Sequence, residues 1–298
     1  MRRISLRRSS RRWSWPRASG LRCKRAIRRS MRAATRRHNP MIRRLLAPLP
    51  RAAVAGRFGL PQPWRAHAAG LSSAADCWRR PDAADVSGQR GRLSSPHAGI
   101  SCRRVEDGLD FEGEFAVVVD EVPQGCSPQQ ALSYIRLIVL LNDISLRTLA
   151  PREMQTGFGF IHAKPASALR RWPSPRMNWG GRQHGRVALT LQVTRNGEPF
   201  GCQSGSEMHF HFGELIAHAA QTRRLRAGTV VGSGTVSGPD ASRGASCIAE
   251  VRAMEMLAHG EPRTPFLSPG ERVTMAAHAP DGRPLFGVLD QHVVMLME

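Results

Sequence analysis

The 298-residue sequence predicts a β-rich α+β domain over residues 105–298, preceded by a basic segment, residues 1–104, that we expect to be largely disordered. Charge is divided unevenly along the chain: residues 1–105 contain 26 basic and 3 acidic residues, a formal charge of +23. Residues 106–298 contain 18 basic and 20 acidic residues, a charge of −2, together with alternating apolar runs and turn signals. A hydrophobic content of 41% is enough for a sizeable core.

The first elements of the β-rich part follow from apolar runs and one cap signal. Residues 109–119, LDFEGEFAVVV, read as a strand. Ser127 is a suitable N-cap and Pro128 suits the first helical position, so we expect a helix from there to about Ile135. The β-branched run that follows, LIVLLNDISL, predicts a buried strand.

The second half continues with a hairpin, a helix and two strands. Asn196-Gly197 stands between two strand-like runs, which is a strong hairpin signal. The stretch FHFGELIAHAAQTRRL predicts a helix, and the stretches GTVVGSGTVSG and RVTMAAH predict strands bounded by glycine turns.

The basic segment has no acidic residue before Asp76. Arg- and Ser-rich starts of this kind are typical of mitochondrial targeting peptides and of arms that bind nucleic acid. A third interpretation is high-GC DNA read in the wrong frame. Nucleic-acid binding is therefore the alternative function from another class, but the scarcity of aromatic residues beside Trp13 and Trp15 disfavours it.

The sequence indicates neither a membrane protein nor a protein stabilised by disulfides. No run approaches the roughly 18 apolar residues of a membrane span, so we expect no transmembrane segment. The six cysteines include no C-x-x-C pair, which predicts neither a zinc site nor a disulfide framework. Reduced thiols in a cytoplasmic protein are the expectation.

Two carboxylates two residues apart are the first candidate for chemistry. Glu112 and Glu114 would project from the same side of a strand, where they repel each other unless a cation lies between them. Magnesium and related ions take such oxygen ligands, and Asp143 at the end of an apolar strand offers a third. The spacing alone leaves open a plainer interpretation, in which the glutamates lie on a solvated face and Asp143 caps a turn.

Five phrases, in this order, resemble the fumarylacetoacetate hydrolase family and cover most of residues 105–298: GLDFEGEFAVVV, IRLIVLLNDISLRTL, TGFGFIHAKPASA, FGELIAHAAQTRRLRAGTVVGSGTVSG and SCIAEVRAMEM. The resemblance implies the mixed β-sandwich roll of the family's C-terminal domain, usually as a homodimer. It also implies a cytoplasmic enzyme of the kind found in aromatic amino acid catabolism.

The resemblance assigns Mg²⁺ or Mn²⁺, with Ca²⁺ as a further possibility, to Glu112, Glu114 and Asp143. Lys164 corresponds to the lysine beside metal and substrate. The resemblance also implies substrate binding by Gly234, Thr235 and Arg147. It further implies that Glu250 supports a catalytic histidine. From the residues alone, Lys164 could be a surface lysine, Arg147 a structural ion-pair partner and Glu250 a member of a salt bridge.

The implied activity is metal-dependent hydrolysis of a C–C bond in a fumarylacetoacetate-like or acylpyruvate-like diketo acid. Such an acid can chelate a divalent ion through adjacent oxygens, and the ion stabilises the negative charge that develops on them. Hydration, decarboxylation or isomerisation of a related 2-oxo acid uses the same kind of site and stays an alternative. A non-catalytic remnant of the family is another.

The chain departs from the family where a histidine base is expected on the N-terminal side. His67 is the nearest candidate, and its surroundings do not match. Residues 169–180, LRRWPSPRMNWG, can be encoded by DNA that reads SPVAVTPDELG, a family-like phrase, two bases later. We therefore expect that compensating slips of the reading frame have scrambled residues 53–103 and 169–180 and impaired the enzyme, which the codons of the gene would decide.

Overall fold

The structure, a computed structural model, describes residues 93–156, 160–171 and 185–296, together with the short strands β1 (Val54–Gly56), β2 (Val86–Ser87) and β9 (Arg182–Gln183). Most of the basic segment, including His67, and most of residues 169–180 lie outside the described residues. The expectations of disorder, of a frame slip and of a domain boundary at residue 105 therefore stay predictions.

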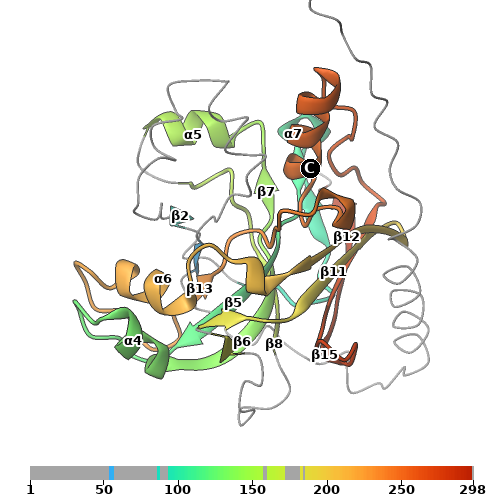
Figure 1. Cartoon of the computed structure of the whole chain (residues 1–298). Coiled ribbons are helices and arrows are strands. Elements are labelled where there is room, and N and C mark those ends of the chain that lie inside the picture. The colour runs from blue at the N-terminus through green and yellow to red at the C-terminus, as the bar shows by residue number, and fades with distance from the viewer. Residues whose placement is uncertain are drawn as a thin grey trace, which may run out of the picture.

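Two β-sheets form the body of the domain (Figure 1). The first has the strand order β2-β1-β13-β5-β6-β8, and the second has the order β12-β11-β14-β15-β3. The strands of the first sheet not yet bounded are β5 (Gly113–Val119), β6 (Ile135–Asn142), β8 (Ala168–Arg171) and β13 (Val230–Gly232). Those of the second are β3 (Ile100–Cys102), β11 (Thr190–Arg195), β12 (Glu198–Ser204), β14 (Arg272–His278) and β15 (Pro284–Met295).

Strand β5 shows how the two faces of the first sheet differ. Its odd-numbered side chains, Phe115 and Val117 among them, join the large core between the sheets, where they meet residues of β11, β14 and β15. The even-numbered Ala116 and Val118 belong to a smaller apolar cluster with Leu141 of β6. Because side chains alternate along a strand, the face that carries this smaller cluster is also the face on which Glu114 lies.

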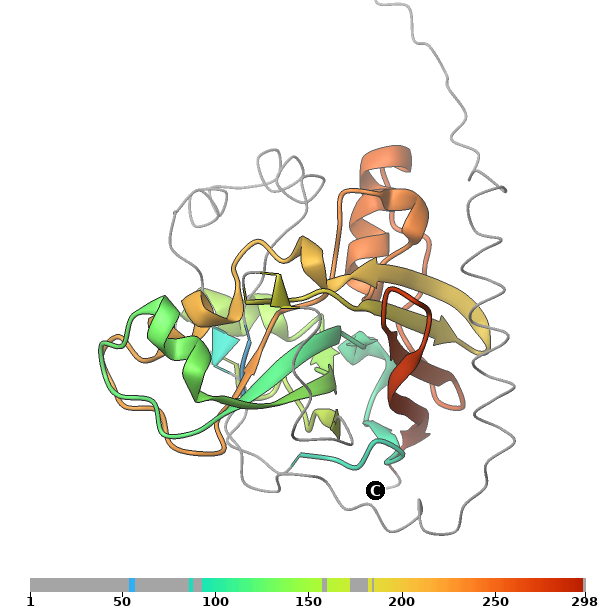
Figure 2. The same ribbon diagram turned by 60° about the horizontal axis from the view of Figure 1, so that its bottom comes forward.

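Two short ribbons and four α-helices complete the described part. The ribbons pair β4 (Leu109–Asp110) with β7 (Ser145–Leu146), and β9 with β10 (Arg186–Val187). The helices are α4 (Pro128–Ala131), α5 (Ala150–Thr156), α6 (Phe212–Ala219) and α7 (Ile248–His259). Helices α4 and α6 pack side by side at one end of the molecule, whereas α7 stands at the other end (Figures 1 and 2).

The expected local signals are largely confirmed. Ser127 and Gln130 form a capping box at the start of α4, and a 3₁₀ turn prolongs the helix to Tyr134 before β6 begins. At the hairpin between β11 and β12, Asn196 has φ 53° and Gly197 has φ 83°, the left-handed values that the Asn-Gly signal predicts. The β-rich α+β class is confirmed as well.

Helix α7 is not indicated by the apolar pattern. Only Ile248 and Glu250 are buried in it, so the helix presents no continuous apolar stripe of the kind that marks an amphipathic helix. It ends at Gly260, which has φ 81° and donates its N–H to the carbonyl of Met256.

The other structural expectations concern membranes and thiols. In the described ranges, no helix has both the length and the apolar character needed to span a bilayer. Among the described residues, no disulfide joins Cys102, Cys126, Cys202 or Cys247, and the expectation of reduced thiols stays a prediction.

Candidate metal centre

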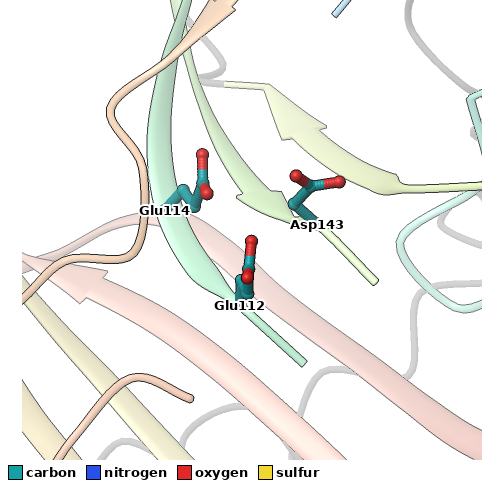
Figure 3. A group of neighbouring side chains, drawn as sticks. All are labelled: Glu112, Glu114 and Asp143. Carbon is teal, nitrogen blue, oxygen red and sulfur yellow. The ribbon is translucent and has the colours of Figure 1, made fainter. Parts of the chain in front are cut away.

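The ends of two neighbouring strands bring the acidic residues together. Glu112 immediately precedes β5 and Asp143 immediately follows β6, and the Asp143 N–H donates to the Glu112 carbonyl at 3.0 Å. Farther along the same pairing, Glu114 lies opposite Leu141. Because alternate residues share a face of the sheet, the side chains of Glu112, Glu114 and Asp143 project into the same space, as Figure 3 shows.

These three predicted metal ligands form one compact group. Each offers a carboxylate oxygen, and the three oxygens lie within 4.8 Å of one another. The residues are 0%, 1% and 6% exposed, in the order Glu112, Glu114 and Asp143. The solvated-face interpretation is therefore wrong for the glutamates, and their role as ligands stays a prediction that this geometry supports.

Lys164 is buried against two of these carboxylates. Its ammonium nitrogen donates to Glu112 Oε2 at 2.8 Å, to Asp143 Oδ2 at 3.0 Å and to Ser145 Oγ at 2.6 Å. Burial disfavours the charge of this ammonium, but the negative charges of Asp143 and Glu112 outweigh burial and raise the pKa of Lys164. The side chain is charged and is not a surface lysine.

Glu153 of α5 fixes the turn that leads to Lys164. Its carboxylate accepts the N–H groups of three consecutive residues, Ile161, His162 and Ala163, at 2.8–3.1 Å. The Ala163 carbonyl in turn accepts the N–H of Leu146 at 2.8 Å. Residue 163 is thus held at both its amide and its carbonyl, which sets the position from which the next side chain enters the site.

Two serines that the sequence reasoning did not single out support the centre. Ser145 accepts from Lys164, and Ser167 Oγ donates to Asp143 Oδ1 at 2.6 Å. Ser145 lies two residues after Asp143 and so shares its face, which is a signal that strand alternation could have given. Ser167 reaches the site from the far side of a loop, and no local pattern indicates it.

Arg147 joins the centre to a further carboxylate, Asp110. The guanidinium lies 2.7 Å from Glu112 Oε1 through Nη2 and donates to Asp110 Oδ2 at 2.8 Å through Nε. Asp110 is fully buried and was not among the predicted site residues. The structure therefore places Arg147 as an ion-pair partner of a predicted ligand, and its role in substrate binding stays a prediction.

The charges in this cluster do not balance. Four carboxylates, those of Asp110, Glu112, Glu114 and Asp143, face the two cations Lys164 and Arg147, which leaves a formal charge of −2 when all are ionised. Within the described part of the chain, Glu114 Oε2 is buried and has no hydrogen-bond partner. Burial, followed by the charges of Asp143 and Glu112, raises the pKa of Glu114 well above its ordinary value.

One divalent cation fits this arrangement. It would neutralise the excess charge and give Glu114 Oε2 a partner, because a buried carboxylate without a counter-charge is unfavourable. The donors are all carboxylate oxygens, which suit Mg²⁺, Mn²⁺ and Ca²⁺ rather than softer metals.

The loop after β13 runs along the glutamate pair. The Val236 N–H donates to the Gly113 carbonyl at 2.9 Å, and the backbone N–H of Gly234 hydrogen-bonds to the Glu114 carboxylate. Gly234 has φ 73°, a conformation that glycine adopts without strain. The hydroxyl of Thr235 is buried and has no hydrogen-bond partner among the residues that the structure describes. The structure thus places Gly234 beside the Glu114 carboxylate, with Thr235 next to it in the chain.

Glu250 lies in the first turn of α7, 5% exposed, and accepts a hydrogen bond from Ser237 of the same loop. Burial raises the pKa of Glu250 to about 7, against the smaller lowering effect of Ser237. Within the residues described, Glu250 forms no salt bridge, so the ion-pair interpretation gains no support. The histidine that it would orient was expected outside the described ranges.

The three histidines of the FHFGELIAH region fit packing and capping roles. His211 is the N-cap of α6 and accepts the Glu214 N–H at 3.3 Å through Nδ1, while His218 lies in the last turn. His209 packs edge-on against the ring of Phe210.

Comparison with known proteins gives relatives of several reaction types. Oxaloacetate tautomerase YisK of Bacillus subtilis (strain 168) is 28% identical over 180 residues, which is 59% of this chain and 56% of the relative. The chain thus matches little more than half the length of this curated relative.

Solved structures share the fold at low sequence identity. The 5-carboxymethyl-2-hydroxymuconate delta-isomerase of Mycobacterium smegmatis matches with a TM-score of 0.60 and 18% identity, over 86% of this chain and 83% of that chain. Fumarylpyruvate hydrolase of Pseudomonas aeruginosa, in complex with Mn²⁺ and pyruvate, matches with a TM-score of 0.59 and 16% identity, over 85% and 93%.

The family model described as fumarylacetoacetate (FAA) hydrolase C-terminal matches residues 65–294, which is most of the sequence. The fold, with its two packed sheets, agrees with the fold that the five sequence phrases implied. The chain belongs to the fumarylacetoacetate hydrolase family.

Proposed function

We propose that the chain is a divalent-metal-dependent hydrolase that cleaves a C–C bond in a fumarylacetoacetate-like or acylpyruvate-like diketo acid. The observation that carries the proposal is the buried triad of Glu112, Glu114 and Asp143, which together with Asp110 sets four carboxylates against the two cations Lys164 and Arg147. The complex of a fold relative with Mn²⁺ and pyruvate supports both the kind of ion and the kind of ligand. We further expect a cytoplasmic homodimer.

Each residue of the site has a role that follows from its position. Glu112, Glu114 and Asp143 would hold Mg²⁺ or Mn²⁺, which supplies stabilisation of negative charge on the oxygens of a chelating 2-oxo acid. Lys164 keeps two of the ligands in place with its charged ammonium, and that same charge favours an anionic substrate beside it. Thr235 offers the substrate carboxylate a hydroxyl that has no partner among the described residues, and Gly234, whose N–H donates to Glu114, shapes the turn that carries it.

Hydrolysis also requires a base that activates water. Glu250, with a pKa of about 7, could accept a proton near neutral pH or orient a histidine that does so. We expect that histidine to be missing from the scrambled N-terminal part of this chain. Loss of a general base lowers a rate by about 10² to 10⁴-fold, so we propose that hydrolysis is slow and that metal binding is retained.

A second candidate is tautomerisation or isomerisation of a 2-oxo acid, which the similarity to an oxaloacetate tautomerase favours. Moving a proton between carbon and oxygen of one substrate needs the cation site and a single acid–base group, and no activated water. Glu250 could serve such a reaction without the N-terminal histidine.

The metal part of the proposal is tested by calorimetric titration of Mn²⁺ into the wild type and into Asp143→Ala. We expect one saturable site in the wild type and a loss of at least about 100-fold in affinity in the variant, because one of three ligands is gone. Equal heats for the two proteins would rule out this site.

The reaction part is tested by following an acylpyruvate and the enol form of oxaloacetate by ultraviolet absorbance with Mn²⁺ present. Release of a carboxylic acid from the acylpyruvate supports hydrolysis, whereas faster ketonisation of the oxaloacetate enol alone supports the second candidate. No turnover of either by a metal-loaded protein would favour a non-catalytic remnant.

A further inference from the structure

Asp110 makes three contacts that no role in metal or substrate binding explains. Its Oδ2 accepts from Arg147 Nε at 2.8 Å. The N–H groups of Ile248 and Ala249, at the start of α7, donate to its two oxygens at 2.8 and 3.0 Å. Asp110 therefore links the helix that carries Glu250 to the arginine that contacts Glu112.

Strand geometry explains how one carboxylate reaches both partners. Asp110 is paired with Ser145 across the antiparallel β4–β7 ribbon. Glu112 lies two residues after Asp110, and Arg147 lies two residues after Ser145. Arg147 directly follows β7, and its side chain reaches both carboxylates. Its guanidinium contacts both of them at once, Asp110 through Nε and Glu112 through Nη2.

This placement determines how much positive charge Glu112 experiences. Both of its oxygens already face cations, Arg147 at 2.7 Å and Lys164 at 2.8 Å. A divalent ion competes with these cations for the same oxygens. If Arg147 had no other anion, its full charge would fall on Glu112, and binding of a further cation would be weaker.

We propose that Asp110 is a positioning residue of the metal centre, which draws the charge of Arg147 away from Glu112 and so keeps Glu112 available to a divalent cation. The proposal rests on the metal site put forward above. It goes beyond that site because it assigns a function to a carboxylate that does not belong to the triad.

The test measures Mn²⁺ affinity by calorimetry in the wild type, Asp110→Asn, Arg147→Met and the double variant. Asp110→Asn should weaken Mn²⁺ binding by about 10-fold, within the range typical of groups that orient metal ligands. In Asp110→Asn/Arg147→Met the arginine charge is also gone, so the affinity should return to within about threefold of the wild type. A purely structural helix cap would not produce this recovery, because the double variant lacks the cap as well.

Asp290→Asn is the matched control. Asp290 forms an ion pair with Arg272 across strands β14 and β15, with hydrogen bonds of 2.5 and 2.7 Å. Its loss should lower the melting temperature and leave Mn²⁺ affinity unchanged.

The outcomes separate this proposal from the proposed function. Absence of Mn²⁺ binding by the wild type would reject the metal site and the role of Asp110 with it. Mn²⁺ binding by the wild type with equal affinity in Asp110→Asn, or no recovery in the double variant, would overturn the role of Asp110 alone. If Asp110→Asn does not fold, the double variant decides: near-wild-type affinity supports the proposal, and lost affinity contradicts it.

Discussion

Two clusters of charged side chains in this domain, one half-buried and one buried, differ in their balance of charge. At the corner next to the β11–β12 hairpin, Glu271 accepts hydrogen bonds at 2.7–2.9 Å from four donors: Arg195 Nε, Arg195 Nη2, Asn196 Nδ2 and the Ser268 N–H. Arg195 also donates to the carbonyls of Pro265 and Phe266. One carboxylate faces one guanidinium, so the two formal charges balance.

The metal centre has the opposite property. Its four carboxylates meet two cations, and Glu114 retains a buried oxygen without a donor. The pKa values move accordingly: although burial alone would raise it, the bonds from Arg195 and Ser268 lower the pKa of Glu271, whereas burial and neighbouring anions raise that of Glu114. A balanced cluster stabilises the fold by itself, whereas an unbalanced one is stabilised by what binds to it.

Among substitutions that test the difference between the two clusters, Lys164→Met should change the free energy of unfolding most. Removing the ammonium leaves Glu112 and Asp143 facing each other without their shared cation, so the metal-free protein should lose about 3–5 kcal/mol of unfolding free energy. Saturating Mn²⁺ should recover part of this loss. Urea unfolding with and without Mn²⁺ measures both, and a loss below about 1 kcal/mol would show that Lys164 does not balance the cluster.

The next effect concerns the pH dependence of stability and Glu250. Since its folded pKa is raised to about 7, the neutral carboxyl is favoured in the fold, and its contribution is complete below about pH 4.5 and is lost as the pH rises through 7. The Glu250→Gln variant has no ionisable group at this position. Its free energy of unfolding, relative to that of the wild type, should therefore rise by up to about 3 kcal/mol between pH 4.5 and pH 8.5. Urea unfolding at several pH values measures the difference; a difference independent of pH would contradict the raised pKa.

The smallest effects form a pair of opposite sign. Glu271→Gln should lower the unfolding free energy by about 2 kcal/mol, because it replaces an acceptor of four donors, and should leave Mn²⁺ affinity unchanged. Glu114→Gln should raise the stability of the metal-free protein by about 1 kcal/mol, since it removes a repelled charge, and should abolish Mn²⁺ binding. Thermal melts of the metal-free proteins give the signs, and equal signs would contradict the distinction between the clusters.

The sequence by itself determined the local elements and the identity of the three acids. Cap and turn residues such as Ser127 and Asn196 act over a few positions, so their effects could be predicted without knowledge of the rest of the chain. The alternation of a strand places Glu112 and Glu114 on one side, and the resemblance of the phrases around Asp143 and Lys164 indicated the remaining partners.

Only the tertiary structure decided which residues support those acids. Asp110 and Ser167 act on the centre through Arg147 and Asp143, which lie 37 and 24 positions away in the sequence. Helix α7 buries only Ile248 and Glu250, so no apolar stripe indicates it, and the Asp110 carboxylate accepts its first N–H groups from across the fold. Local patterns reflect backbone preferences, whereas charge balance depends on every group that folding brings within a few ångströms.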